Sequence, residues 1–428
     1  MLGRFLGSTA VYTIANIVNA AVPFALLPVL TRLLSPEDYG TVAMFATTVS
    51  VLSAFTGLSV HGAISVRYFE QESFHLPSVV RTGLALVTGA TLVSVALVAL
   101  GRSWLGEFTH LPVTWLVAAT VLSGAQFLMQ IQLALWQAEH KPIRYGALRI
   151  GQSCLDVALS LALVLFVSRT WQGRSAGQWA AGIAFACLTL FLLSRGGWLR
   201  GRVRADYLRN LLHFGVPLIP HTLGGLAIAL VDRYLVSNIL GIGNTGIYMA
   251  GLQLGMAMGL MSDAFVKAFG PWLNRQLKID DEASRHRVVG AVYASFLALP
   301  AIGCAIYGVM WLAFDFVLPD SYREARTVLP FFIAGNTFLG MYYAIAGLIF
   351  FSSQTYRISK ITGLIGLVSI PMTWMLITKF GLIGASLSYA ASQLLVFLLA
   401  WRESTALFTL PWRQVRLSIR TLAGGVPT

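Results

Sequence analysis

The sequence predicts an all-α integral membrane protein with about twelve transmembrane helices. Of its 428 residues, 57% are hydrophobic and only 11% are charged, and the mean hydropathy is +0.73. An average soluble domain has about 25% charged and about 45–50% apolar residues. Lipid favours helices because every backbone polar group must find its hydrogen bond inside the protein. No charged stretch is long enough to form a large soluble catalytic domain.

Twelve apolar runs are long enough to cross a bilayer, which takes about 20 residues of helix. The apolar run after Met1–Arg4 is longer than the core of a secretory signal peptide, so we interpret it as the first span. The predicted spans are residues 7–33, 40–66, 82–100, 112–135, 146–168, 177–194, 214–240, 246–269, 288–314, 328–352, 359–379 and 381–401.

The net charge of +13 comes from 30 Lys and Arg against 17 Asp and Glu. If the N-terminus is cytoplasmic, the segments on that side contain about three times as many Lys and Arg as those on the other side. Such a bias is typical of cytoplasmic loops. It predicts that both termini are cytoplasmic, and it explains the positive charge without a nucleic-acid partner. The three cysteines lie in apolar runs and predict neither a disulfide nor a metal site.

Two basic segments outside the spans predict helices at the membrane surface. Residues 195–213 contain five arginines followed by apolar residues, and the tail places Arg413, Arg416 and Arg420 on one helical face. Basic amphipathic segments bind anionic lipid surfaces. Recruitment of an anionic substrate is the alternative interpretation of both segments.

The two halves of the chain share a pattern that predicts an internal repeat. Residues 27–52 and 228–256 each contain an apolar helix, an arginine, a turn and a glycine that opens the next span. The arginines are Arg32 and Arg233, and the glycines are Gly40 and Gly246. The repeat predicts two six-helix lobes, residues 1–200 and 201–428. Chance similarity between apolar helices is the alternative.

The repeated segments also carry a family resemblance, in PVLTRLLSPEDYGTVAMF and in FGVPLIPHTLGGLAIALVDRYLVSNILG followed by TGIYMAG. They resemble the polysaccharide-export branch of the MOP superfamily, which includes the Wzx-type flippases for lipid-linked O-antigen, capsule and exopolysaccharide units. The resemblance implies two lobes arranged as a V around a polar central cavity, in the bacterial inner membrane. It also implies a polyprenyl-diphosphate-linked oligosaccharide as substrate, and membrane lipid, a polysaccharide polymerase and glycosyltransferases as partners.

Polar residues inside the predicted spans are candidate substrate contacts. A phosphate-linked sugar chain cannot enter hydrocarbon, because each unpaired polar group costs several kcal/mol there. Arginine suits a diphosphate because its guanidinium donates two hydrogen bonds at once, and amides suit a glycan. Hydrogen bonds between helices are the alternative role. The candidate cavity residues are Tyr12, Asn16, Asn19, Arg32, Arg67, Gln126, Gln130, Arg149, Gln152 and Arg233.

Asp156 is the deepest acidic residue of the predicted spans. It lies about 16 Å into the fifth span at 1.5 Å per residue, close to the membrane midplane. An ionisable residue at this depth is a functional candidate. Arg149 shares its face of the helix but is two turns away, too far for a direct pair. Asp156 and Asp232 are therefore the candidate ion-coupling residues, with a structural hydrogen bond as the alternative for Asp156.

The function predicted from these features is translocation of the lipid-linked oligosaccharide by alternating access, coupled to an inward proton or sodium gradient. A multidrug exporter of the same superfamily is one alternative, although more arginine than acid surrounds the expected cleft. A membrane-embedded polymerase or glycosyltransferase is another, although the short outward loops show no recognisable catalytic set. The sequence contains no GxxxxGK[ST] motif for ATP hydrolysis. We expect no enzymatic activity, no cofactor and no metal.

Overall fold

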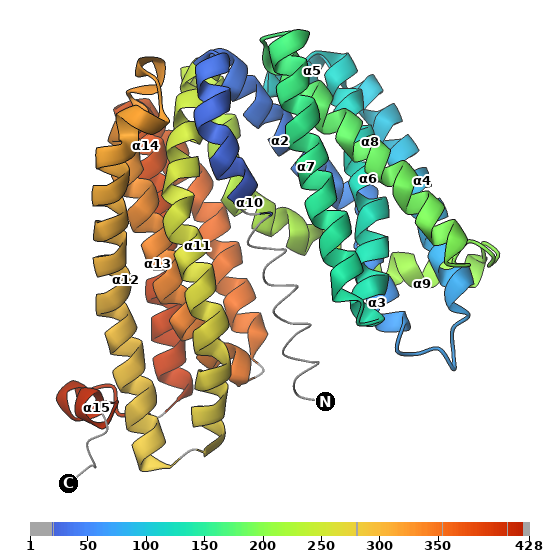
Figure 1. Ribbon diagram of the computed structural model, residues 1–428. Coiled ribbons are helices and arrows are strands. Elements are labelled where there is room, and N and C mark those ends of the chain that lie inside the picture. Colours follow the sequence, from blue (N-terminus) through green and yellow to red (C-terminus); the bar gives the residue numbers. More distant parts are fainter. Residues whose placement is uncertain (1–18, 20, 280, 353, 409, 423–428) are drawn as a thin grey trace. The chain divides into compact units, whose positions relative to one another are not determined.

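The computed structural model describes residues 19, 21–279, 281–352, 354–408 and 410–422, and this part of the chain contains helices and no strands (Figure 1). Two compact units meet in sequence at Gly246 and Ile247. The predicted all-α membrane class is confirmed, because nine of the described helices are long and apolar enough to cross a bilayer.

Unit 1 consists of helices joined by short connections. Its elements are the helix Ala21–Leu33, α2 (Pro36–Gly57), α3 (Val60–Arg67), α4 (Leu76–Leu100), α5 (Arg102–Thr109), α6 (Val113–Ala138), α7 (Pro142–Phe166), α8 (Trp171–Arg195), α9 (Ala205–Gly215) and α10 (Leu218–Leu240).

Unit 2 contains longer helices. The first of them begins in the last residues of unit 1. The elements are α11 (Ile242–Ile279), α12 (Glu282–Val317), the 3₁₀ turn Asp320–Tyr322, α13 (Ala325–Phe351), α14 (Thr355–Leu407) and α15 (Val415–Leu422).

Each of the twelve predicted spans coincides with described helix, the first through its part Ala21–Leu33. Several helix ends differ from the predicted bounds, as at α8, which begins at Trp171 and not at residue 177. The predicted span 40–66 is divided into α2 and α3 by Leu58 and Ser59, which both have positive φ. The predicted division between the last two spans is confirmed inside α14, because two helices meet at the non-helical Gly381, where φ is +59°. Glycine adopts this left-handed conformation without the steric cost of a Cβ.

Unit 1 extends beyond the predicted lobe boundary at residue 200, because α9 packs on α4 and α10 packs on α2. Tyr207 and Leu211 of α9 belong to one hydrophobic cluster with Val80 of α4 and Ile131 of α6. These contacts show which residues form one compact unit, but they do not show how the helices are grouped into bundles. The division into six-helix lobes and their arrangement as a V around a cavity therefore stay predictions.

Gly40 and Gly246, the glycines of the predicted repeat, each lie against the helix that contains the other. A Cβ on Gly40 would lie 2.1 Å from the Ile242 carbonyl oxygen, and a Cβ on Gly246 would lie 1.9 Å from the Pro36 carbonyl oxygen. Each glycine thus meets the residue four positions before the other glycine, as a local two-fold relation requires. The reciprocity supports the internal repeat, and the close crossing requires that both residues lack a side chain.

Small residues also set the packing inside unit 2. Gly251, Gly255 and Gly259 form one ridge of α11, and a Cβ on Gly251 or Gly255 would lie within 2.5 Å of Val328 or Phe332 of α13. Helices in lipid gain stability mainly from van der Waals packing, which small residues improve by letting backbones approach.

The first turn of α12 supplies a pH-dependent contact outside the spans. The Asp281 carboxylate accepts a 2.6 Å hydrogen bond from the Ser284 backbone N–H. The Ser284 side chain and backbone N–H lower the pKa of Asp281 below its ordinary value of 3.8. Folding therefore favours the ionised form, and this cap stabilises the helix fully above pH 3.8 and loses its effect as pH falls through the lower folded-state pKa.

We expect the protection factors of the amides in the first turn of α12, which are the intrinsic hydrogen-exchange rates at each pH divided by the observed rates, to decrease as the pH falls below about 4, the ordinary Asp range. Asp281→Asn should flatten this dependence, because asparagine caps helices without titrating. Glu282→Gln removes a carboxylate from the same turn and should keep the wild-type dependence. An equal response of wild type and Asp281→Asn would contradict this role of the cap.

Candidate functional site

A row of polar side chains follows one face of α7. Each of Arg149, Gln152, Ser153, Asp156 and Ser160 lies three or four residues from another member of the row, so they share this face. All of them except the buried Ser160 are partly exposed. The Ser153 hydroxyl donates to the Asn19 side-chain oxygen, which brings one predicted residue of the first span to this face.

Asp156 forms an ion pair with Arg174 of α8. The two guanidinium nitrogens of Arg174 lie 2.5 Å and 3.3 Å from the two carboxylate oxygens. The Ser160 hydroxyl donates to Asp156 at 3.1 Å and accepts from Arg174. Only 11% of the Arg174 side chain and 22% of the Asp156 side chain are exposed. A charge pair withdrawn from water in this way needs both partners, because removing one leaves an uncompensated charge.

Two features of the local sequence hold Arg174 in reach of Asp156. The Asp38 carboxylate accepts a 2.9 Å hydrogen bond from the backbone N–H of Trp171, which fixes the first residue of α8. Gly177 lies against α7, since a Cβ there would be 2.5 Å from the backbone of Ser160. The register of the α7–α8 pair therefore directs the long Arg174 side chain along α7 to the carboxylate one turn deeper.

Sequence reasoning missed Arg174 as a site residue, because it placed residues 169–176 in an outward loop. The structure starts α8 at Trp171, so Arg174 already belongs to its first turn. The signal for this pair was the short connection between the fifth and sixth spans, which forces the two helices to pack side by side. The predicted neighbour Arg149 lies on the same face, but the ion-pair partner of Asp156 is Arg174.

A second arginine site lies where α10 packs on α2. The Arg233 guanidinium donates to the Thr47 hydroxyl at 3.3 Å, and its backbone N–H donates to the Asp232 carboxylate at 2.8 Å. Asp232 is buried and Arg233 is half-buried. Both predicted residues therefore lie inside the helix packing of unit 1, with α2 of the first repeat beside them.

Several buried polar atoms near these residues keep hydrogen-bonding capacity. Within the described residues, the Nε atoms of Arg149, Arg174 and Arg233 and the hydroxyl of Thr48 have no hydrogen-bond partner in the protein. Buried polar groups are nearly always satisfied by protein, water or ligand. Three arginines of unit 1 can thus donate further hydrogen bonds to an anion.

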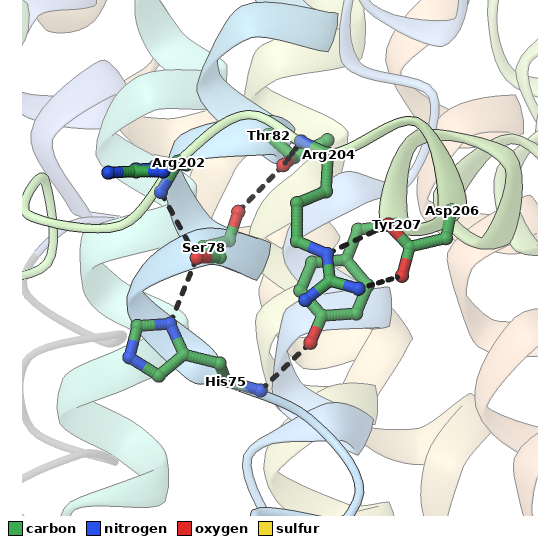
Figure 2. Close-up of polar contacts among 7 residues, drawn as sticks. All are labelled: His75, Ser78, Thr82, Arg202, Arg204, Asp206 and Tyr207. Carbon is green, nitrogen blue, oxygen red and sulfur yellow. Dashed lines mark hydrogen bonds and ion pairs between the residues drawn. The ribbon is translucent and has the colours of Figure 1, made fainter.

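The linker between α8 and α9 is held on the start of α4 through its backbone, as Figure 2 shows. The N–H groups of Arg202 and Arg204 donate to the hydroxyls of Ser78 and Thr82 at 3.1 Å and 3.2 Å. A Cβ on Gly201 would lie 2.2 Å from the backbone of Ser78, so the close contact requires glycine. Because the backbone makes these bonds, the Arg202 side chain stays exposed.

The beginning of α9 completes this contact. The Tyr207 hydroxyl accepts from the His75 backbone N–H at 3.1 Å, and Arg204 pairs with Asp206 at 2.8 Å (Figure 2). The hydrogen bond from Arg204 lowers the pKa of Asp206, and a hydrogen bond from the backbone N–H of Tyr207 lowers it further. The predicted surface helix is therefore present as α9, and its position at the membrane surface stays a prediction.

Arg67 is anchored beside the same linker. It donates from Nε to the Asn210 side-chain oxygen at 3.1 Å and pairs with Glu70 at 2.6 Å, while its guanidinium lies 4.8 Å from the Phe74 ring centroid. These contacts hold the end of α3 against α9. A role for Arg67 in substrate capture stays a prediction.

Of the remaining predicted cavity residues, Gln152 shares the face of α7 with Asp156, and those of the others that the structure describes lie on other helices. Arg32 is exposed and donates to the Pro28 carbonyl at 3.0 Å. Gln126 and Gln130 are half-buried on α6, and Gln152 is half-buried on α7. Tyr12 and Asn16 lie outside the described residues. The structure thus brings together Asn19, Arg149, Gln152 and Asp156, and it adds Ser153, Ser160 and Arg174 to them.

Comparison with known proteins identifies the family. The family model described as "Polysaccharide biosynthesis protein" matches residues 5–276, which is more than half of the chain. The chain belongs to the polysaccharide biosynthesis protein family. This match confirms the resemblance seen in the sequence. A putative O-antigen transporter from Shigella flexneri is also similar, with 24% identity over 289 residues, or 64% of this chain and 66% of that protein.

Two solved structures share the fold of this family member. The lipid II flippase MurJ in an inward closed conformation superposes with a TM-score of 0.67 at 15% identity, over 96% of this chain and 90% of that chain. An inward-facing multidrug transporter of the MATE family, from the MOP superfamily, gives 0.65 at 15% identity, over 92% and 94%. The polysaccharide biosynthesis family member therefore has the fold of a membrane transporter, in agreement with the expectation that it is not an enzyme.

Proposed function

We propose that this protein flips a polyprenyl-diphosphate-linked oligosaccharide across the inner membrane by alternating access. The observation that carries the proposal is the set of partly buried arginines in unit 1 whose Nε atoms lack a protein partner. Family membership and the similarity to a putative O-antigen transporter support the same substrate class. The polyprenyl chain remains in lipid, so the protein needs to shield only the diphosphate and the sugars.

The three arginines lie at two different places in unit 1. Arg149 and Arg174 belong to the α7–α8 pair, and Arg233 lies between α10 and α2. Their guanidinium groups suit phosphate oxygens because each presents a planar fork of donors. The half-buried Gln126, Gln130 and Gln152 supply amides for the glycan.

Asp156 is the residue we assign to coupling, through its pair with Arg174. In the paired state the carboxylate occupies both terminal nitrogens of the guanidinium. Addition of a proton to Asp156 would remove the charge that holds Arg174 there, and the guanidinium would become available to the diphosphate. Loss of the proton would restore the pair and release the substrate. Proton binding and substrate binding at these two residues are thereby linked.

The test is transport by the purified full-length protein in sealed vesicles. Lipid-linked oligosaccharide bearing an undecaprenyl-diphosphate anchor is placed in one leaflet, and its appearance in the other is followed by access to an added glycan-modifying enzyme. We expect transfer at least tenfold above protein-free vesicles, with acceleration by an inward proton gradient.

Complementation of an O-antigen flippase-null strain provides the cellular readout. Export of polymer on expression of this chain would support the proposal. Failure with every undecaprenyl-linked repeat tried, together with efflux of cationic dyes from the vesicles, would overturn it and establish the multidrug alternative, which the shared fold of the MATE transporter allows.

A further inference from the structure

The C-terminal helix α15 is docked on α12 in one defined orientation (Figure 1). The His286 ring nitrogen and the Ser418 hydroxyl lie 3.0 Å apart in a hydrogen bond, and both residues are buried. A Cβ on Gly290 would lie 2.3 Å from the Ser418 carbonyl oxygen, so the helices touch backbone to backbone. The Tyr293 hydroxyl donates to the Trp412 carbonyl at 3.0 Å. These contacts fix which face of α15 points away from the protein.

The outward face of α15 combines charge with apolar surface. Arg416, Ile419 and Arg420 are exposed, and they line a cavity of about 510 Å³ together with Leu417. Arg413 is exposed in the turn that precedes α15, two residues before the helix begins. Two exposed arginines of α15 therefore flank two aliphatic side chains, and a third exposed arginine precedes the helix.

The positive charge of this face is not compensated by the protein. No Asp or Glu occurs anywhere after Glu403 in the sequence. Within the described residues, Arg413, Arg416 and Arg420 take part in no ion pair. In unit 1 the basic linker differs, because Arg204 there is paired with Asp206. The α15 face is thus a basic surface whose charge is available for a ligand.

The length of α12 places this face at the depth of lipid headgroups. The helix has 36 residues and is about 54 Å long at 1.5 Å per residue, whereas the hydrocarbon core is about 30 Å thick. His286 precedes the predicted span 288–314 and Gly290 lies in its first turn, so both lie near the end of the span if the helix crosses the bilayer there. A helix attached there meets phosphates on one side and acyl chains on the other.

From this geometry we propose that α15 forms a binding site for an anionic phospholipid. Arg413, Arg416 and Arg420 bind the phosphate and the headgroup, and Leu417 and Ile419 contact the glycerol and the first methylenes. A soluble phosphate would use the arginines but gain nothing from the two aliphatic side chains. The mixed lining of the cavity therefore favours a lipid, and the site is independent of the transport cycle proposed above.

The test is native mass spectrometry of the full-length protein in detergent, titrated with phosphatidylglycerol or phosphatidylcholine. We expect the wild type to bind phosphatidylglycerol at least tenfold more tightly than phosphatidylcholine. The triple variant Arg413→Gln, Arg416→Gln, Arg420→Gln should lose this preference. The matched control Arg102→Gln, Arg169→Gln, Arg323→Gln removes the same charge from exposed arginines elsewhere and should retain it.

Three further measurements decide between the possible ligands. Ile419→Ser should weaken phosphatidylglycerol binding and leave the binding of glycerol phosphate unchanged. If the wild type binds inorganic pyrophosphate as tightly as phosphatidylglycerol, and millimolar pyrophosphate displaces the lipid, the proposal is overturned in favour of a soluble phosphate. If the triple variant cannot be purified, Arg416→Gln and Arg420→Gln must each weaken binding at least threefold, and unchanged binding in both would also overturn it.

Discussion

Alanine at Gly40 is expected to abolish export and to lower the melting temperature by several degrees. The new Cβ would lie 2.1 Å from the Ile242 carbonyl oxygen and 2.9 Å from the Gly246 nitrogen. Backbone atoms cannot rotate away as a side chain can, so the helices must separate by more than an ångström. Overpacking of a close contact costs about 1–3 kcal/mol or more, and here it also moves the start of α11. Gly246→Ala should have the same effect through the Pro36 carbonyl oxygen.

The controls for this prediction are glycines with open space around them. Gly89, Gly308 and Gly363 lie in helices, and a Cβ on any of them would meet nothing within 4 Å. Alanine at these positions should leave export unchanged and stability unchanged or slightly raised, because alanine favours helix over glycine by about 1 kcal/mol in water. Thermal unfolding in detergent and polymer export in cells measure the two effects separately.

The combination of the two substitutions tests whether one contact is responsible. Gly40→Ala and Gly246→Ala disrupt the same crossing, so the second substitution should add little once the first has separated the helices. Simple addition of the two losses would show that the glycines act independently. Wild-type stability of either single variant would show that the helices do not meet as closely as the backbone contact requires.

The positions of most helices follow from composition alone, since a membrane span needs a long apolar run and little else. The details that failed depend on local backbone conformation. Leu58 and Ser59 break the second predicted span with positive φ values, although neither is glycine and nothing in their sequence marks the break. By contrast, the predicted boundary between the last two spans is confirmed, because two helices meet at the non-helical Gly381.

The site residues that share one helix could be predicted from the sequence, whereas the ion pair between two helices could not. The spacing of Arg149, Gln152 and Asp156 placed them on one face of α7, and depth singled out Asp156. Its partner could not be found in this way, because Arg174 reaches it through the register of two helices, which depends on the cap from Asp38 and the contact at Gly177. Periodicity describes one helix, whereas such a pair depends on how two helices pack.

Neutralising Asp156 alone should cost more stability than neutralising both members of its pair. Asp156→Asn leaves the Arg174 guanidinium, only 11% exposed, without its counter-charge. Removal of one partner from a buried pair costs about 3–5 kcal/mol, whereas removal of both is often close to neutral. We therefore expect Asp156→Asn and Arg174→Gln to unfold at clearly lower temperatures than the wild type. The double variant Asp156→Asn, Arg174→Gln should recover most of that loss.

An exposed pair of the same chemistry gives the matched control. Lys267 and Asp263 pair at 2.5 Å on α11, with about half of each side chain exposed. Exposed pairs contribute about 0–1 kcal/mol, so Asp263→Asn and Lys267→Gln should change the melting temperature little, singly or together. If neutralising Asp263 or Lys267 lowered the melting temperature as much as neutralising Asp156 or Arg174, burial would not explain the loss of stability.

Transport by the double variant separates a structural role of the pair from a role in coupling. If the pair only holds α7 and α8 together, the folded double variant should export normally and respond to the proton gradient as the wild type does. If Asp156 carries the coupling proton, the double variant should fold but lose the acceleration by an inward gradient, because neither of the two neutral amides that replace the pair can exchange a proton or a charge. We expect the second result. A wild-type gradient response in the double variant would remove Asp156 from the mechanism and leave the flippase proposal itself to the vesicle assay.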